Sequence, residues 1–147
     1  MTLTWQVTPI SQKSIRLCWE ACGHMLWNWH YKDEKVRAAY KHRAGVYSNM
    51  DTGLSQEEMD QFYKMLGLRC LENPRGENIV HALKWSPVIA TSIDQSTGHA
   101  MVVDGHAGGH YMIINPCASQ YVDFNTNNND SCTVGITQIQ RTEFNKN

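Results

Sequence analysis

"SQKSIRLCWEACGHMLWNW", residues 11–29, carries a stripe of apolar residues that begins at a cysteine and recurs at helical spacing. The stripe consists of Cys18, Ala21, Cys22, Met25, Leu26 and Trp29. Intervals of three and four residues place these side chains on one face of an α-helix. Because Trp19 and Trp27 extend the apolar surface beyond this face, the sequence predicts a central, largely buried helix that starts at Cys18.

Weaker helical signals follow this segment in the chain. Residues 33–43 have the character of a short helix, and residues 77–83 predict another. Between them, Ser55 and Glu58 form the S-x-x-E pattern of a capping box, in which each side chain satisfies a backbone N–H of the other residue. The pattern predicts a helix after Ser55 that ends at Gly67, because glycine suits the position that follows a helix.

The second half of the chain contains the strand signals. Pro87 opens a β-branched run, and residues 98–116 hold two apolar segments on either side of "GHAGG", residues 105–109. This pattern predicts a β-hairpin with a five-residue loop. Residues 132–139 predict a further strand. Because helices precede strands, we expect a single α+β domain over residues 1–147.

Length, charge and hydropathy exclude several classes of protein. A chain of 147 residues suits one domain, and a net charge of −1 without a lysine or arginine cluster argues against nucleic-acid and membrane partners. The start, "MTLTWQVTPI", lacks the pattern of a secretory signal, and no apolar run approaches the length of a membrane span. We therefore expect a cytoplasmic protein, or a domain cut from a longer exported chain. The five cysteines are an odd count, which argues against a closed disulfide framework and predicts reduced thiols.

The predicted hairpin brings together two polar residues of a catalytic type. With residues 105–109 as the loop, His99 lies directly opposite Asn115, whose side-chain oxygen can accept the imidazole N–H. Cys18 lies at the start of the predicted helix, where the helix dipole and free N–H groups favour a thiolate. The side-chain amide of Gln12 can donate a hydrogen bond to an oxyanion. Nucleophile, base, orienting residue and oxyanion donor are therefore all present.

Three short segments resemble the papain-like cysteine peptidases. They are Q-x5-C-W-x-A at residues 12–21, GHAMVV at residues 98–103 and INP at residues 114–116. The resemblance implies a papain-like fold, in which an N-terminal helical half carries the cysteine on a central helix. A C-terminal antiparallel sheet then carries the histidine and the asparagine.

The same resemblance implies the roles of five residues. Cys18, His99 and Asn115 match the catalytic triad, and Gln12 matches the glutamine that precedes the nucleophile. Trp19, next to the nucleophile, is a candidate wall of the substrate cleft. The reaction that follows is hydrolysis of a protein or peptide amide through a thioester on Cys18, with no cofactor and no metal.

The chain also departs from papain and the cathepsins. The separation between Cys18 and His99 is shorter, and the small residues that flank the cysteine in those enzymes are absent. The chain is more similar to compact bacterial members, namely leader peptidase domains that cut after double glycine and toxin or effector domains. Those leader peptidases usually carry aspartate where this chain has Asn115. The similarity implies a toxin or effector that cleaves a target-cell protein after glycine and has a cognate immunity protein.

Other interpretations of these residues stay open. A papain-like scaffold also supports deamidation, transglutamination and cleavage of peptidoglycan amides, and a binding module without activity is a further alternative. Cys18 and Cys22 are metal-ligand types, although C-x3-C within a helix is not a zinc-binding pattern. Asp104 and His106 form a second candidate pair, in which the carboxylate of Asp104 orients the imidazole of His106.

Overall fold

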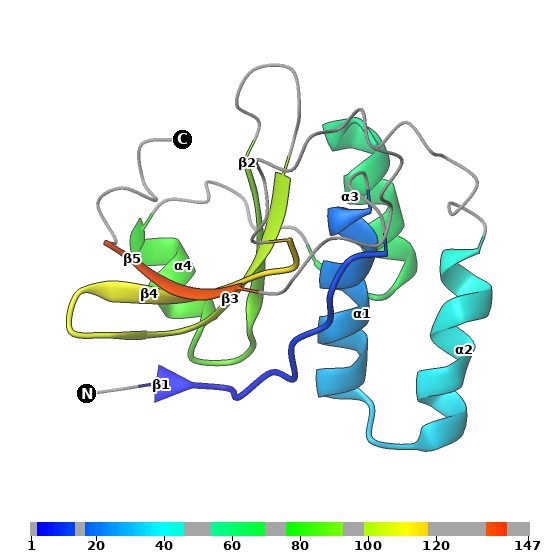
Figure 1. Cartoon of the computed structure of the whole chain (residues 1–147), viewed down its shortest axis with the longest axis horizontal. Helices are drawn as coiled ribbons and strands as arrows, with labels where there is room; N and C mark the ends of the chain where they lie inside the picture. Colours follow the sequence, from blue (N-terminus) through cyan, green and yellow to red (C-terminus); the bar gives the residue numbers. More distant parts are fainter. Residues whose placement is uncertain are drawn as a thin grey trace.

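The computed structural model describes residues 3–13, 17–45, 54–69, 76–92, 99–117 and 135–140. Figure 1 shows a group of helices beside a twisted sheet. The helical half contains α1 (Cys18–His30), α2 (Glu34–Ala44) and α3 (Gln56–Met65). This arrangement confirms the predicted α+β class, in which helices precede the sheet.

In the part of the chain that the structure describes, five strands form one antiparallel sheet. They are β1 (Leu3–Thr4), β2 (Val88–Ser92), β3 (His99–Ala107), β4 (His110–Asn115) and β5 (Gly135–Gln140). Strand β3 is central, because β4 pairs with one of its sides while β1 and β2 share the other. Strand β5 pairs with the outer side of β4, which confirms the predicted C-terminal strand.

Helix α1 is buried on two sides, as its apolar pattern predicts. On one side, Cys18 and Cys22 pack against Val102 and Ile114 of the sheet. On the other side, α2 and α3 supply most of a second core, in which Trp19 is buried. The helix therefore joins both halves of the molecule.

Gly23 permits the close approach of α2 and α3 to α1. A Cβ atom at this position would lie 2.9 Å from Leu66 Cδ1, 2.9 Å from Phe62 Cε2 and 3.2 Å from the Tyr40 hydroxyl. Only a residue without a side chain fits at these distances without movement of its neighbours. The glycine in the middle of the helix is thus a packing requirement.

The ends of α3 are confirmed as predicted, and α2 has a cap that was not predicted. Asp33 caps α2, because its Oδ1 accepts hydrogen bonds from Lys35 N at 2.8 Å and Val36 N at 3.2 Å. Ser55 and Glu58 form both hydrogen bonds of the predicted capping box at the start of α3. Gly67 follows α3 with φ +89°, a conformation that favours glycine.

The predicted register of the hairpin is wrong. Strand β3 continues to Ala107, and the turn consists of Gly108 and Gly109 alone. Both glycines have positive φ, at +53° and +86°, as a tight two-residue turn requires. The predicted five-residue loop is thus replaced by longer strands.

A β-bulge at Asp104 shifts the register a second time. Gly105 pairs with Met112, whereas Val103 pairs with Ile113 on the other side of the bulge. By the same count, Asn115 comes opposite position 101 instead of position 99. The turn and the bulge together shift the predicted partner of Asn115 by two residues, from position 99 to position 101. Because a shift of two residues keeps a position on the same face of a sheet, position 99 still lies diagonally across from Asn115.

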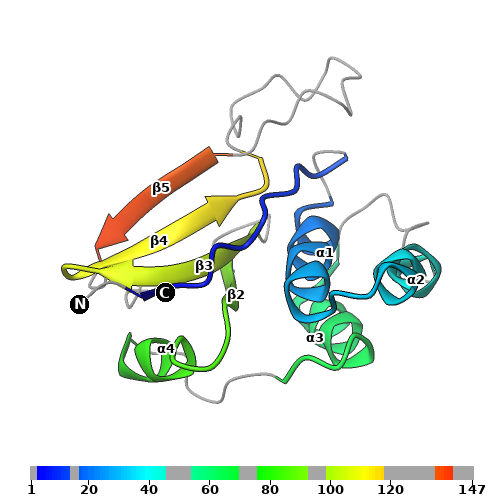
Figure 2. The ribbon, with the colours of Figure 1, turned by 90° about the horizontal axis from the view of Figure 1, so that it is seen from below.

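Residues 4–13 run from the last residue of β1 towards the start of α1, and we call this segment the N-terminal strap. Trp5 N donates to Asp104 O at 3.0 Å, and the indole N–H of Trp5 donates to Leu83 O at 2.8 Å. Farther along, Gln12 N donates to Pro116 O at 3.1 Å. Figure 2 shows the strap running past the sheet towards α1. It is therefore tied to the sheet near both of its ends.

Helix α4 (Gly76–Ala82) lies against the sheet through a third core. Ile79 and Leu83 are buried there against Val103, Tyr111 and Ile113. The turn that follows α4 exposes Trp85 to 74%.

The cysteines differ from the predicted set of five reduced thiols. Cys18 and Cys22 are free, but Cys117 is disulfide-bonded. The odd count of cysteines does not exclude a single bond, because it excludes only the pairing of all five. Separately, the described helices include none that is long and apolar enough to cross a membrane.

Candidate active site

Cys18 is the first residue of α1 and is 5% exposed. Burial raises the pKa of its thiol above the ordinary value, while backbone N–H groups of Ala100, Trp19 and Cys18 itself act in the opposite direction. The sequence predicts a thiolate favoured by the helix start. The N–H groups at the helix start are present, but the desolvation of the thiol outweighs them.

The contact with Ala100 fixes where Cys18 lies relative to the sheet. Ala100 is the second residue of β3, and His99 is the first. The backbone of His99 pairs with Ser92 of β2, so its position along the strand is defined. The side chain of His99 lies outside the described atoms. The structure therefore brings position 99 next to the residue that contacts the Cys18 sulfur.

Asn115 is the last residue of β4 and is partly buried. Its side-chain oxygen accepts a hydrogen bond from Cys117 N at 3.0 Å. This local bond holds the Asn115 side chain at the end of the strand. An amide oxygen has two lone pairs and can accept two hydrogen bonds.

Gln12 lies beside the end of β4 and is only 3% exposed. Its backbone N–H donates to the carbonyl of Pro116, the residue that follows Asn115. From the sequence, Gln12 is expected to precede the helix and to have no part in the core. The structure instead buries Gln12 beside Pro116, to which its backbone is hydrogen-bonded.

These contacts bring the chain segments of all four predicted catalytic residues into one region. The backbone of Gln12 binds next to Asn115, and Cys18 contacts the residue after His99. The ladder of β3 and β4 joins these two points through the pair Val102 and Ile114. Both of these apolar residues pack in the core that contains Cys18.

Trp19 is a core residue in this structure. It is 1% exposed, and its ring packs edge-on against Phe62 with the centroids 4.8 Å apart. The Tyr63 hydroxyl donates to the backbone carbonyl of Trp19 at 3.1 Å. The side chain thus points to α3, which corrects its expected place in the wall of a cleft.

The alternative sites gain little from the geometry. Among the described residues, no group of three histidine, cysteine, aspartate or glutamate side chains converges as a metal site would require. Cys22 is completely buried, and burial raises the pKa of its thiol well above the ordinary value. The carboxylate of Asp104 accepts hydrogen bonds from Thr4 and Val7 of the strap. This role differs from the candidate pairing of Asp104 with His106.

The contacts of Pro116 and Ala100 were not anticipated from the sequence. Both use backbone groups, which every residue type has, so no residue pattern marks them. The nearest available signal is their place in the chain, since each follows a predicted catalytic residue. The segments INP and GHA therefore indicate where the candidate site lies, but they do not show which backbone groups make the contacts.

A family model described as "Papain-like cysteine protease AvrRpt2" matches residues 2–131. The chain belongs to this family. It is a papain-like cysteine peptidase and hence a hydrolase, which confirms the enzyme class and the fold predicted from its three short segments. No curated protein and no solved structure matches the chain.

Proposed function

We propose that this cysteine peptidase hydrolyses a peptide bond of a protein substrate with Cys18 as the nucleophile. His99 is the base and acid, and Asn115 orients its ring. The observation that carries the proposal is the position of Cys18, whose sulfur at the first turn of α1 meets the backbone of Ala100, next to His99. An imidazolium at that place would offset the cost of a buried thiolate.

The reaction follows from these roles in two halves. The Cys18 thiolate attacks the substrate carbonyl, and His99 gives its proton to the leaving amine as the C–N bond breaks. The resulting thioester is attacked by water, from which His99 takes a proton, and Cys18 leaves as a thiolate. The side-chain amide of Gln12 and the backbone N–H of Cys18 donate to the oxyanion in both halves.

The burial of Cys18 supports a preference for glycine on the acyl side of the cut. A nucleophile that is 5% exposed leaves little space for a side chain on the residue it attacks. Glycine lets an extended backbone approach most closely. We therefore propose cleavage after glycine, best after two glycines, in an exposed segment of the substrate.

We further propose that the protein is a toxin or effector that acts on a protein of a target cell and is blocked by a cognate immunity protein. The disulfide of Cys117 supports a period outside a reducing cytosol, because such bonds form and persist in oxidising compartments. The substrate is a protein, which follows from the peptidase class. Nucleic acid and membrane are not proposed as partners, since the charge is balanced.

Terminal proteomics tests the reaction and its preference together. Target cells that express the active protein, Cys18→Ala or Cys22→Ala are compared for new protein N-termini. We expect new termini after glycine in the active protein and in Cys22→Ala, whose replaced thiol is completely buried one helical turn after Cys18. No termini should appear with Cys18→Ala. Deamidated or cross-linked glutamine without new termini would instead establish one of the alternative acyl chemistries.

A further inference from the structure

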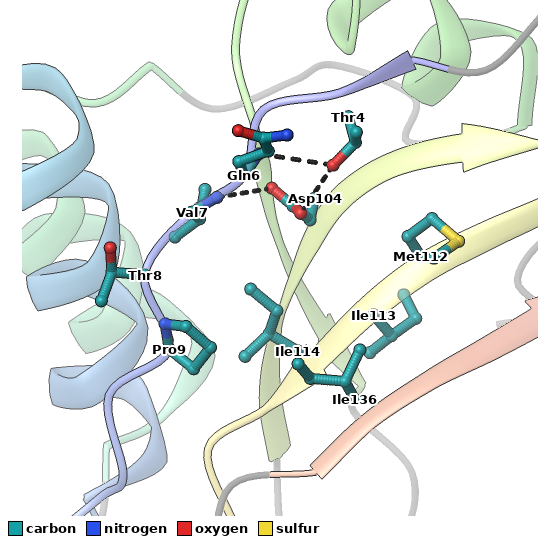
Figure 3. Close-up of a pocket in the computed structure, with 10 residues that line it drawn as sticks. All are labelled: Thr4, Gln6, Val7, Thr8, Pro9, Asp104, Met112, Ile113, Ile114 and Ile136. Carbon is teal, nitrogen blue, oxygen red and sulfur yellow. Dashed lines mark hydrogen bonds between the residues drawn. The ribbon is translucent and has the colours of Figure 1, made fainter.

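Asp104 holds the N-terminal strap with both oxygens of its carboxylate. Oδ1 accepts from Val7 N at 3.0 Å, and Oδ2 accepts from the Thr4 hydroxyl at 3.0 Å. Figure 3 shows both bonds at one end of a pocket of about 350 Å³ between the strap and the sheet. The backbone carbonyl of Asp104 also accepts from Trp5 N, so a single residue fixes three successive parts of the strap.

The bulge in β3 explains why Asp104 has this role. The extra residue breaks the ladder between Val103 and Gly105, and the bulged position is released from regular pairing with β4. A bulge redirects a side chain, and here the carboxylate is directed to the strap. Gln6 lies between the two anchored residues with φ +53°, a strained conformation for a residue with a side chain. The hydrogen bonds of Asp104 on both sides hold it there.

Packing and a proline restrict the strap between the residues that Asp104 binds and Gln12. Val7 is 5% exposed and packs in the core that contains Cys18, and Ile10 packs against the same core. Pro9 fixes its own φ and restricts Thr8 before it. A shift of Val7 is therefore passed along the chain to Gln12, whose backbone is held at its other end by Pro116.

We propose that Asp104 is a positioning residue for the peptidase reaction and acts through the strap on Gln12. It fixes where the strap begins, and the core and Pro9 carry that position to the oxyanion donor. This inference rests on the oxyanion role proposed above for Gln12. The effect is transmitted through hydrogen bonds and packing, and Asp104 itself does not touch the substrate.

A double-mutant cycle tests this inference. Asp104→Ala, Gln12→Ala and the double variant are compared for kcat and KM on a peptide found by terminal proteomics. We expect Asp104→Ala to lower kcat by about 10- to 100-fold with little change in KM, because a small misplacement of a transition-state donor has effects of this size. In the Gln12→Ala background, Asp104→Ala should lower kcat no further. Alkylation of Cys18 by iodoacetamide should stay within about twofold in every variant, because alkylation forms no oxyanion.

Two further variants separate positioning from general loss of stability. Asp33→Ala removes a carboxylate that likewise accepts two hydrogen bonds, here from backbone N–H groups at the start of α2, so it should lower the melting temperature and leave kcat unchanged. Asp104→Asn should restore kcat, because its amide oxygen can accept from Val7 N while its NH₂ donates to Thr4 Oγ1. If Asp104→Ala does not fold, Thr4→Val removes one of the two carboxylate bonds and should show the same loss within the cycle, at smaller size.

The outcomes distinguish this inference from the proposed function. Full additivity of the Asp104 and Gln12 effects, or an unchanged kcat in Asp104→Ala, overturns the inference and leaves the role of Gln12 intact. A silent Gln12→Ala overturns the proposed oxyanion role and the inference with it. If Asp104→Ala lowers kcat in the wild-type background but not in the Gln12→Ala background, the result supports both the inference and the oxyanion role of Gln12.

Discussion

At the scale of single residues, the reactivity of Cys18 depends on a balance between desolvation and hydrogen bonding. Burial raises the pKa of its thiol, and three backbone N–H groups oppose that effect without overcoming it. A reactive thiolate at neutral pH therefore needs a further partner. In the proposed mechanism that partner is the imidazolium of His99, which makes the ion pair open to a direct test.

The pH dependence of Cys18 alkylation should change in His99→Ala. In the wild type, an ion pair with His99 keeps the thiolate populated at neutral pH, so iodoacetamide should label Cys18 between about pH 6 and 8. Without the imidazolium, burial is left as the dominant effect, and the midpoint of labelling should move above the ordinary thiol value of about 8.5. Peptide mapping follows the site, with Cys22 as an internal control that stays unlabelled. An unchanged midpoint in His99→Ala would remove His99 from the ion pair.

The side chain of Asn115 should be replaceable by a carboxylate. Asn115→Asp retains an oxygen that can accept both the Cys117 N–H and the imidazole N–H, so we expect it to keep most of the activity. Asn115→Ala loses both bonds and should lower kcat by about 10- to 100-fold while still leaving measurable turnover. The comparison of kcat and melting temperature for the two variants decides the matter. Equal activity in both would show that the side chain orients nothing.

At the scale of elements, α1 carries a buried carboxylate whose cost depends on pH. Burial raises the pKa of Glu20 above its ordinary value of about 4.3, and the charge of Lys13 opposes this only in part. The folded state therefore favours the neutral acid, and its stability is lost as the pH rises through the folded pKa. Below the unfolded pKa both states are protonated, so no such penalty remains.

Glu20→Gln should accordingly gain stability relative to the wild type as the pH rises. We expect the difference in melting temperature between variant and wild type to be small near pH 4 and to shift in favour of the variant by pH 7. Glu34→Gln is a suitable control, because that carboxylate lies exposed in the first turn of α2. A difference that is the same at both pH values would show that the burial of Glu20 has no energetic effect.

Gly23→Ala should destabilise the helical half despite the higher helix propensity of alanine. The added methyl group would lie 2.9 Å from atoms of Leu66 and Phe62, and such overpacking costs about 1–3 kcal/mol. The gain in propensity is about 1 kcal/mol, so the net loss should reach up to about 2 kcal/mol. Denaturant unfolding measures it. Ala39→Gly on the exposed face of α2 calibrates the propensity in this protein, and a gain in Gly23→Ala equal to that calibration would contradict the close packing.

The elements also show which structural features a sequence can predict. Helices α1 and α3 were predicted with their starts, because apolar spacing and the capping box of Ser55 are local properties of the chain. The hairpin register was wrong, because the turn at Gly108 and Gly109 and the bulge at Asp104 each add a shift that alternation alone does not reveal. The predicted face of position 99 is retained only because the two shifts together move the pairing by an even number of residues, and successive residues of a strand alternate between its two faces.

At the scale of the whole molecule, the segments that hold the candidate catalytic residues could be predicted, but the contacts that support these segments could not. Cys18, His99 and Asn115 stand out by residue type and order along the chain. The burial of Gln12 and of Trp19 depends on where the strap and α3 pack, which no local pattern states. Backbone contacts such as Gln12 with Pro116 are likewise tertiary and leave no mark in the sequence.

The disulfide of Cys117 lies next to the segment that carries Asn115. Cys117 follows the end of β4 by two residues and forms the bond with its sulfur, while its backbone N–H holds Asn115. Stability and catalysis should therefore separate in Cys117→Ala. Loss of the bond should cost about 2–4 kcal/mol of unfolding free energy. Alanine retains the N–H that binds Asn115, so kcat at a temperature well below the transition should stay within about threefold of the wild type.

Denaturant unfolding and kcat are measured side by side to check this separation. The wild type in reducing buffer should unfold at the same denaturant concentration as Cys117→Ala, and the variant itself should not respond to reductant. Cys22→Ala controls for the loss of a buried thiol that forms no disulfide. An unchanged midpoint in Cys117→Ala would show that the bond does not stabilise the fold. A large drop in kcat without a change in stability would instead make the disulfide part of the catalytic geometry, because Asn115 would then depend on the position of the Cys117 sulfur as well as on its backbone.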